Sequence, residues 1–185
     1  MIIDYNQKRL AVFADTHGKH RKLPLIKTDI AIHLGDACTL GNNSQFSDFL
    51  DWFSQYPAKY KLFVAGNHEL QWMYEPDEFL KMFPPNIIFL ENRNILLEGI
   101  NFASVAARMN LSKYPRIKLS KKVDFLLTHA PPTGILDNGF GCAVLKKFVT
   151  KIKPAYHLFG HVHETGGTYL KRDETIFMNV SVFNQ

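Results

Sequence analysis

Five short apolar runs, each followed at once by polar residues, constrain the fold of this chain most strongly. The runs are rich in β-branched and aromatic residues and are typical of buried strands. They span residues 9–14, 29–34, 60–65, 123–128 and 155–159. Two segments between them carry apolar residues at helical spacing: Phe46, Phe49, Leu50 and Phe53, and then Cys142, Leu145, Val149 and Ile152. Strands that alternate with helices predict an α/β domain.

The limits of these elements can also be predicted. Asn43 or Ser44 is expected to cap the first helix, because short polar side chains accept backbone N–H groups there. Residues 168–171 and 175–182 are expected to form a hairpin around Arg172-Asp173. The sequence contains no repeat, low-complexity tract or linker. A length of 185 residues therefore predicts a single domain over residues 1–185.

The polar residues that follow the five runs are expected to meet at one edge of the sheet. In an open α/β sheet, ligands bind beyond the carboxyl ends of the strands. The residues at these ends are Asp15 and His17, then Asp36, then Asn67, His68 and Glu69, then His129, and finally His161, His163 and Glu164. A single histidine at a strand end is more often structural than functional. The ordered set at five strand ends favours a functional site.

Carboxylate, amide and imidazole donors without thiolate favour Mn²⁺, Fe, Zn²⁺ or Co²⁺ over a soft, cysteine-rich site. Two Asp, one Asn and four His of this set make seven donors, which are too many for one ion. They suit two ions about 3.5–4 Å apart, bridged by one carboxylate. The two cysteines, Cys38 and Cys142, lack C-x-x-C spacing and are too few for a disulfide framework. Glycines at 35, 66 and 160 precede three of the motifs and would let the backbone approach the ions closely.

Other histidines and two acids receive separate interpretations. His33 and His157 lie inside strand patterns and are predicted to be structural, whereas His20 is expected in an exposed loop. Glu69 and Glu164 each have two equally weighted interpretations. Either could orient a ligand histidine from behind, or be a surface carboxylate.

The chain carries 22 Lys and Arg against 17 Asp and Glu, a net charge of +5. Residues 108–122 hold six basic side chains and no acid: Arg108, Lys113, Arg116, Lys118, Lys121 and Lys122. This segment is either a basic flap that faces an anionic substrate or nucleic acid, or a solvated loop, with the loop slightly favoured. No aromatic platform or helix-turn-helix pattern accompanies it, so a nucleic-acid-binding domain is not favoured.

The first ten residues lack the basic and apolar regions of a signal peptide. No apolar run reaches the roughly 18–20 residues of a membrane span. We therefore expect a cytoplasmic protein without a membrane partner. No oligomeric state is predicted.

In their order, Asp15-x-His17, Gly35-Asp36, Gly66-Asn67-His68-Glu69, His129 and Gly160-His161-x-His163 resemble the calcineurin-like metallophosphoesterase pattern. The resemblance covers residues 10–163. The longer stretches IAIHLGD, AGNHEL, THAPPTGILD and FGHVHE are similar to the branch of metallophosphoesterase-domain proteins with reported cyclic-nucleotide phosphodiesterase activity.

The resemblance implies a four-layer α/β/β/α sandwich of two mixed sheets with helices outside. It implies that Asp15, His17 and His163 hold one divalent ion, that Asn67, His129 and His161 hold a second, and that Asp36 bridges them. Mn²⁺ is the expected ion, with Fe, Zn²⁺, Co²⁺ and Ni²⁺ as alternatives. His68 would not bind metal but would act at the leaving group. Asn67, Arg108 and Asn110 are the candidate substrate contacts.

These roles predict a phosphodiesterase that acts on a small cyclic nucleotide through a metal-bridging hydroxide, with His68 as general acid. The alternatives are a phosphomonoesterase or nucleotide or dinucleoside-polyphosphate hydrolase, a nuclease, and a non-catalytic scaffold. The expected partner is a small phosphate ester, and nucleic acid is less favoured. No Arg follows Gly35-Asp36, which argues against a phosphoprotein phosphatase. Residues 104–122 are basic and lack the Trp and Phe of the corresponding branch loop, so substrate specificity does not transfer.

Overall fold

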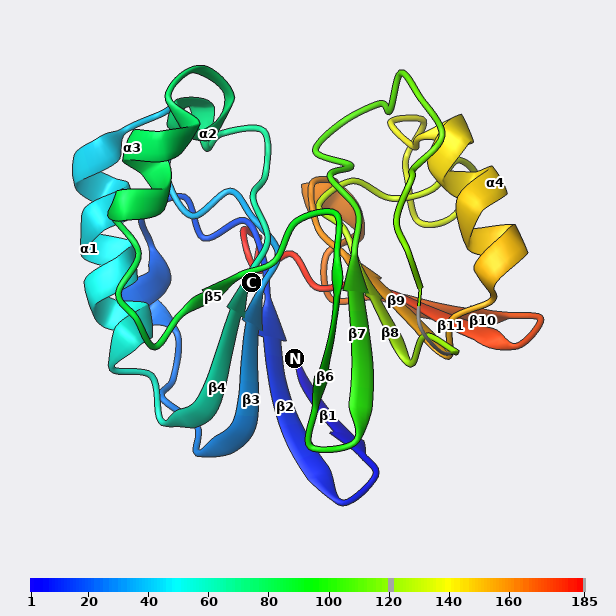
Figure 1. Cartoon of the computed structure of the whole chain (residues 1–185), viewed down its shortest axis with the longest axis horizontal. Helices are drawn as coiled ribbons and strands as arrows, with labels where there is room; N and C mark the ends of the chain where they lie inside the picture. The colour runs from blue at the N-terminus through cyan, green and yellow to red at the C-terminus, as the bar shows by residue number, and fades with distance from the viewer. Residues whose placement is uncertain (120–121, 185) are drawn as a thin grey trace.

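The computed structural model describes residues 1–119 and 122–184, so the basic residue Lys121 lies outside the described residues. In the described part, two mixed β-sheets face each other and helices cover both outer faces (Figure 1). This arrangement confirms the predicted four-layer α/β/β/α sandwich.

The first sheet has the strand order β1-β2-β3-β4-β5. Strand β1 (Ile2–Tyr5) is antiparallel to β2 (Lys8–Phe13). The parallel strands that follow are β3 (Thr28–His33), β4 (Ala58–Phe63) and β5 (Ile88–Phe89). The helical segments of this half are η1 (His20–Lys22), α1 (Asn43–Ser54), α2 (Leu70–Tyr74) and α3 (Pro76–Lys81), and α1 and α3 cover the outer face (Figure 1).

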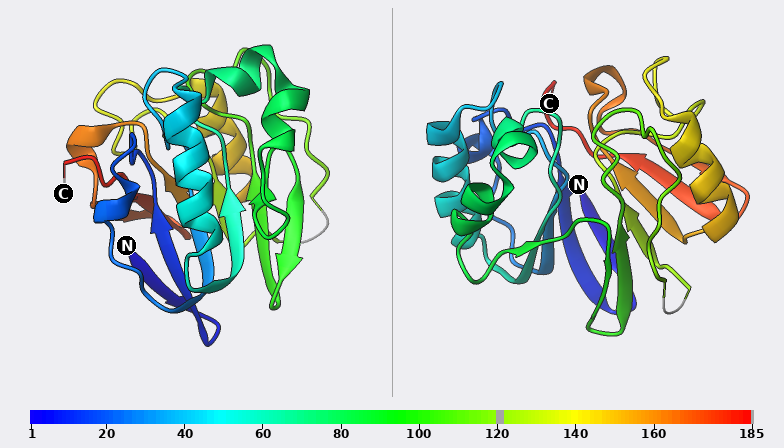
Figure 2. Two further views of the ribbon diagram at one scale, coloured as in Figure 1. Left: turned by 90° about the vertical axis from the view of Figure 1, so that its left-hand side faces the viewer. Right: turned by 45° about the horizontal axis from the view of Figure 1, so that its top comes forward.

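The second sheet has the order β10-β11-β9-β8-β7-β6. Its central parallel strands are β7 (Ile100–Ser104), β8 (Phe125–Leu127), β9 (Tyr156–Phe159) and β11 (Thr175–Asn179). Antiparallel edge strands, β6 (Asn94–Leu97) and β10 (Tyr169–Arg172), close it on either side. Helix α4 (Ala143–Ile152) covers the outer face, and η2 (His163–Thr165) follows β9 (Figure 2).

Three apolar clusters hold the layers together. Aliphatic side chains dominate the space between the sheets, among them Val12, Ile32, Leu62, Leu127 and Leu158. Aromatic rings dominate the layer under α1 and α3, whereas the layer under α4 is smaller and mixed. Burial of this apolar area supplies the main driving force for stacking the layers.

The two sheets are joined at one edge. The N–H of Ala14, just after β2, donates to Val180 O, and the N–H of Val182 donates to Ala14 O. Ala14 and Ser181 thereby form a parallel bridge, so β2 and β11 run in the same direction. The carboxyl ends of the parallel strands in both sheets therefore meet at the upper edge in Figure 1.

All five predicted strands are present with small shifts of their ends, and so is the hairpin of β10 and β11. The predicted N-cap of α1 was wrong, because Asn42, and not Asn43 or Ser44, accepts the N–H of Gln45. The sequence analysis also missed β1, β5, β6, β7, α2 and α3. These elements are short, and the β1–β2 turn uses two left-handed residues, Asn6 and Gln7, without the glycine that marks such turns.

The prediction for His20 was wrong as well. Its side chain is buried against Phe49 and Trp52, and Nε2 lies 2.9 Å from Asp48 Oδ2. The flanking Lys19 and Arg21 are exposed, and this charged context concealed a core ring. Within the described residues, no helix is long and apolar enough to span a bilayer.

Candidate metal centre

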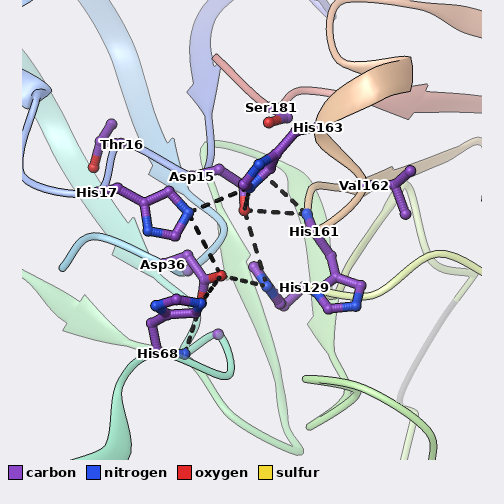
Figure 3. A network of polar contacts seen from close by, with 12 residues as sticks. Asp15, Thr16, His17, Asp36, His68, His129, His161, Val162, His163 and Ser181 are labelled. Carbon is purple, nitrogen blue, oxygen red and sulfur yellow. Dashed lines mark hydrogen bonds and ion pairs between the residues drawn. The ribbon is translucent and has the colours of Figure 1, made fainter. Parts of the chain in front are cut away.

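Three overlapping groups of potential metal-binding side chains lie at the joined edge (Figure 3). In each group the donor atoms all lie within 4.8 Å of one another. The groups are Asp15, His17 and His163; His17, Asp36 and His68; and Asp36, His129 and His161. Asn67 joins them, because its Oδ1 lies 3.0 Å from His129 Nε2. The structure thus brings together all seven predicted ligands and His68.

Strand ends deliver each of these residues. Asp15 and His17 follow β2, Asp36 follows β3, Asn67 and His68 follow β4, His129 follows β8, and His161 and His163 follow β9. The site therefore draws on both sheets, and it exists only because the sheets are joined at this edge.

The backbone at the site is strained. Four of the predicted ligands adopt left-handed conformations: Asp15 (φ 59°), His17 (φ 42°), Asp36 (φ 57°) and His161 (φ 68°). Such conformations cost of order 1–3 kcal/mol for residues other than glycine and cluster at functional sites. The fold stabilises these residues in positions that local preference disfavours.

Two glycines allow the loops to approach one another. A Cβ at Gly66 would overlap Asp36 Oδ1, and a Cβ at Gly160 would overlap Asp15 Oδ2. Any larger residue would therefore displace a carboxylate. The glycines thus bring the backbone against the two carboxylates, and the approach to ions stays a prediction.

Hydrogen bonds fix the tautomers of two histidines. His17 Nδ1 lies 3.2 Å from Cys38 O, and His129 Nδ1 lies 2.6 Å from Leu34 O. A carbonyl can only accept, so each Nδ1 carries the proton. In the neutral rings, the lone pair is then on Nε2, which faces the cluster. A backbone carbonyl that fixes the ring in this way is typical of histidine ligands.

His68 has the opposite arrangement. The backbone N–H of Leu40 donates to His68 Nδ1 at 2.9 Å. An N–H can only donate, so the proton of the neutral ring is on Nε2, which lies 3.8 Å from Asp36 Oδ2. His68 therefore presents a proton to the site, whereas His17 presents a lone pair, and His129 presents one when its ring is neutral.

The electrostatics of the cluster fit divalent cations. Asp15 and Asp36 are buried, and neither forms an ion pair with a Lys or Arg of residues 1–119 or 122–184. Around His129 Nε2, only acceptors converge: Asn67 Oδ1 at 3.0 Å, Asp36 Oδ2 at 3.3 Å and Asp15 Oδ1 at 3.9 Å. The backbone N–H groups of His68 and His161 donate to Asp36 and Asp15, but no Lys or Arg of the described residues offsets the charge of these carboxylates. Positive charge between them would stabilise the buried site, and the carboxylate and imidazole donors suit divalent ions.

The pKa shifts follow from this arrangement. Burial raises the pKa of Asp15 to about 7, assisted by the neighbouring Asp36 charge. Burial alone would lower the pKa of His129, but Asp36 and Asp15 raise it to about 9. Burial lowers the pKa of both His17 and His161 to about 4. These two rings are therefore neutral at pH 7, the form that binds metal.

Glu69 has a role that the sequence analysis missed. Its buried carboxylate accepts the N–H groups of Asp36 at 2.9 Å, Ala37 at 2.8 Å and Gly66 at 2.6 Å. Among the described residues it bonds to no histidine ring, and it is buried, so neither interpretation was right. Glu69 instead ties the loop after β3 to the loop after β4. Glu164, by contrast, is exposed.

The two strand histidines are buried, as the structural interpretation predicted. His33 Nδ1 accepts the N–H of Gly35, so Nε2 donates to Thr16 Oγ1 at 3.1 Å. Thr128 Oγ1 donates to Ala130 O and therefore accepts from His157 Nε2 at 2.9 Å. Thr16 lies between Asp15 and His17, and Thr128 precedes His129. Each histidine thus fixes a threonine beside predicted ligands.

Residues after β11 cover one side of the cluster. No sequence pattern indicated this contact. The Phe183 ring stacks on His163 at 4.2 Å between centroids and meets the edge of His17 at 5.2 Å. Asn184 Nδ2 donates to His163 O, and Lys19 Nζ lies 4.4 Å from the Phe183 centroid. This packing helps to fix the orientation of the His163 ring.

Two predicted substrate contacts lie outside the cluster. Arg108 forms an ion pair with Glu91 and lies over Trp72, at 5.9 Å from its centroid. Asn110 is exposed. Their roles toward a substrate, and that of the basic segment, stay predictions.

Comparison with known proteins gives consistent matches. The sequence model of the calcineurin-like phosphoesterase family matches residues 8–165. A UPF0046 protein of Caenorhabditis elegans is 28% identical, covering 96% of this chain and 70% of its own length. Human metallophosphoesterase domain-containing protein 1 is 27% identical, covering 94% and 66% respectively.

The fold also matches solved structures. The crystal structure of phosphopantetheinyl hydrolase from Mycobacterium tuberculosis aligns with a TM-score of 0.66 at 14% identity. The alignment covers 94% of this chain and 88% of that one. At this identity the likeness establishes a shared fold.

Proposed function

The chain belongs to the calcineurin-like phosphoesterase family, whose metal-dependent chemistry its donor cluster fits, and we propose that it hydrolyses a phosphodiester, a small cyclic nucleotide. Its relatives confirm the metallophosphoesterase-domain branch that the motifs indicated. The diester substrate, the metal assignments and the proton donor are the proposal.

In this proposal Asp15, His17 and His163 hold one cation, and Asn67, His129 and His161 hold the other. Asp36 spans both sets, because it belongs to two of the three donor groups. When bound, two divalent cations offset charge on the phosphate oxygens and lower the pKa of a water toward neutrality. Mn²⁺ is the ion we propose, and Fe, Zn²⁺, Co²⁺ and Ni²⁺ are the alternatives.

The tautomer of His68 carries the proposal. Leu40 N–H occupies Nδ1 and holds the ring, so that Nε2–H points at the cluster. A leaving alkoxide needs a proton, and an imidazole N–H in this position can supply it. Lone-pair donation from Nε2 to a metal would require Nδ1 to carry the proton, and Leu40 N–H blocks that arrangement.

Charge favours a diester over a monoester. A phosphodiester carries one negative charge at neutral pH, whereas a monoester carries nearly two. The candidate Arg108, which could offset a second charge, is already paired with Glu91. A substrate that needs fewer cationic partners suits this site better.

The test compares His68→Ala with His163→Ala. We expect His68→Ala to keep two metals per chain and to lose roughly 10²–10⁴-fold in turnover of cyclic nucleotides. Bis-nitrophenyl phosphate, whose leaving group needs no proton, should lose less. His163→Ala should instead lose metal, as measured by elemental analysis. Loss of metal in His68→Ala would show that His68 is a ligand.

Substrate choice is tested with Mn²⁺-loaded protein on 2′,3′- and 3′,5′-cyclic nucleotides, mononucleotides, dinucleoside polyphosphates and oligonucleotides. Preference for a cyclic nucleotide supports the proposal. Faster turnover of mononucleotides would support a monoesterase, and salt-sensitive cleavage of oligonucleotides would support a nuclease. A protein that binds no metal would be a scaffold.

A further inference from the structure

A pocket of about 290 Å³ lies on the outer face of the second sheet, between α4 and the β10–β11 hairpin. Figures 1 and 2 show α4 and this hairpin side by side, at the side of the molecule away from α1. Over the described residues, the lining of the pocket includes none of the predicted metal ligands. The pocket is therefore separate from the metal-ligand cluster.

The floor of the pocket is apolar. Ile135, Val149 and Phe177 line it, and all three side chains are more than nine-tenths buried. A small concave site with an apolar floor and a few polar groups at its rim is the usual form of a ligand-binding pocket.

The rim carries cations from two directions. Lys146 and Lys153 come from α4 and its carboxyl end, and Arg172 comes from the hairpin. Asp173 and Glu174, at the hairpin turn, also line the rim. None of these five side chains forms an ion pair with any residue of the described ranges, although opposite charges line the same pocket. The cations are thus available to a ligand.

We propose that this pocket binds a small organic monoanion, with a ring on the apolar floor and its acidic group between the α4 lysines and Arg172. The shape supports the ring, because the floor is buried and the volume admits one or two fused rings. The charge supports a single anionic group, because three cations face two acids and leave one net positive charge. A polyphosphate would meet repulsion from Asp173 and Glu174.

The probe is 2-naphthalenesulfonate, which has two fused rings and one negative charge and is a weak metal ligand. Its neutral counterpart is 2-naphthalenemethanol. Titration into the ¹⁵N-labelled full chain should shift the amide signals of Val149 and Phe177 with one saturable site, and leave those of His17 and Asn67 unchanged. The neutral probe should bind at least tenfold more weakly, since it lacks the charged contact.

Charge reversal provides the decisive comparison. Lys146→Glu combined with Arg172→Glu should weaken sulfonate binding at least tenfold. The matched control, Lys147→Glu combined with Lys171→Glu, changes the neighbouring exposed lysines that do not line the pocket and should bind as the unchanged chain does. Equal loss in both variants, equal binding of the neutral probe, or shifts confined to other regions would overturn the proposal. The amide spectrum of each variant verifies its fold.

Discussion

The two halves of the molecule, one built on each sheet, use the same device to position the site but contribute different chemistry. His33 fixes Thr16 in the first half, and His157 fixes Thr128 in the second. The first half then supplies both carboxylates of the cluster, and it also supplies Asn67 and His68. Within the described residues, the second half supplies imidazoles alone. In the proposed mechanism, the negative charge that attracts cations and the proton for the leaving group therefore come from one half.

The halves also differ in their cores. The layer under α1 is a network of stacked and edge-on rings that includes Phe46, Phe49, Phe53, Phe63 and Phe79. The layer under α4 has fewer rings and leaves the pocket beside the β10–β11 hairpin. The half that carries the two carboxylates therefore has the core richer in aromatic rings.

The largest expected effect in the first half is that of Asp36→Asn, because Asp36 is the proposed bridge between the two metals. We expect this variant to lose both metals and nearly all activity. Asn tolerates the left-handed backbone and can still accept the N–H of His68, so the fold should persist. Elemental analysis and turnover of the best substrate measure the effect.

The matched variant in the second half is His161→Ala. His161 belongs to one donor group only, so this variant should retain one metal. If Asp36→Asn kept two metals and full activity, Asp36 would not bridge, and the contrast between the halves would fail.

The contrast between the cores predicts unequal costs for two matched helix residues. Phe49 on α1 is fully buried and contacts six other rings, including His33 at 4.5 Å. Phe148 on α4 has one such neighbour, Tyr114. Phe49→Ala should lower the free energy of unfolding by about 5 kcal/mol and Phe148→Ala by about 3 kcal/mol. Urea denaturation measures both, and equal costs would contradict the difference.

The shared histidine device can be tested for equivalence. His33 bonds at both ring nitrogens, whereas Nδ1 of the buried His157 has no partner. Gln can replace the single donor of His157 but cannot replace both contacts of His33. At pH 7, we expect His157→Gln to lower the free energy of unfolding by about 1 kcal/mol or less. His33→Gln should lower it by about 2 kcal/mol more than that. The reverse order would show that the pairs are held differently.

The buried His157 should also make the second half sensitive to acid. Burial lowers the pKa of His157 to about 3. The unfolded chain therefore takes up this proton first as the pH falls below about 6.5, and stability is lost toward pH 3. Between pH 7 and 4.5 the loss from this residue should be about 2 kcal/mol, and His157→Gln should remove it. Urea denaturation at several pH values, with a chelator present, measures the free energy of unfolding. If that free energy fell with pH as steeply in His157→Gln as in the unchanged chain, the prediction would be contradicted.

The sequence predicted which side chains would meet at the sheet edge better than it predicted the shorter elements around them. Strand ends followed by Asp, His and Asn identify residues such as Asp36 and His129, because a local pattern and a shared sheet edge are enough to bring them together. Glu69 and Phe183 could not be predicted, because their roles depend on contacts between loops that only the folded chain forms.

The remaining errors have local causes. Short strands such as β5, with two residues, leave too little periodicity to detect. His20 was misread because charged neighbours surround it in sequence, while its ring packs on Phe49 and Trp52. In each case the sequence neighbours differ from the spatial neighbours.

The left-handed backbone at Asp15 and Asp36 limits which substitutions each position can accept. Asn and Gly adopt this conformation readily, whereas β-branched residues do so only at high cost. A library of all substitutions at these positions, sorted separately for folded protein and for turnover, should therefore give two distinct profiles. Asn and Gly would pass the first selection and fail the second, so fold and catalysis impose separate limits on the mutational routes open to the same residue.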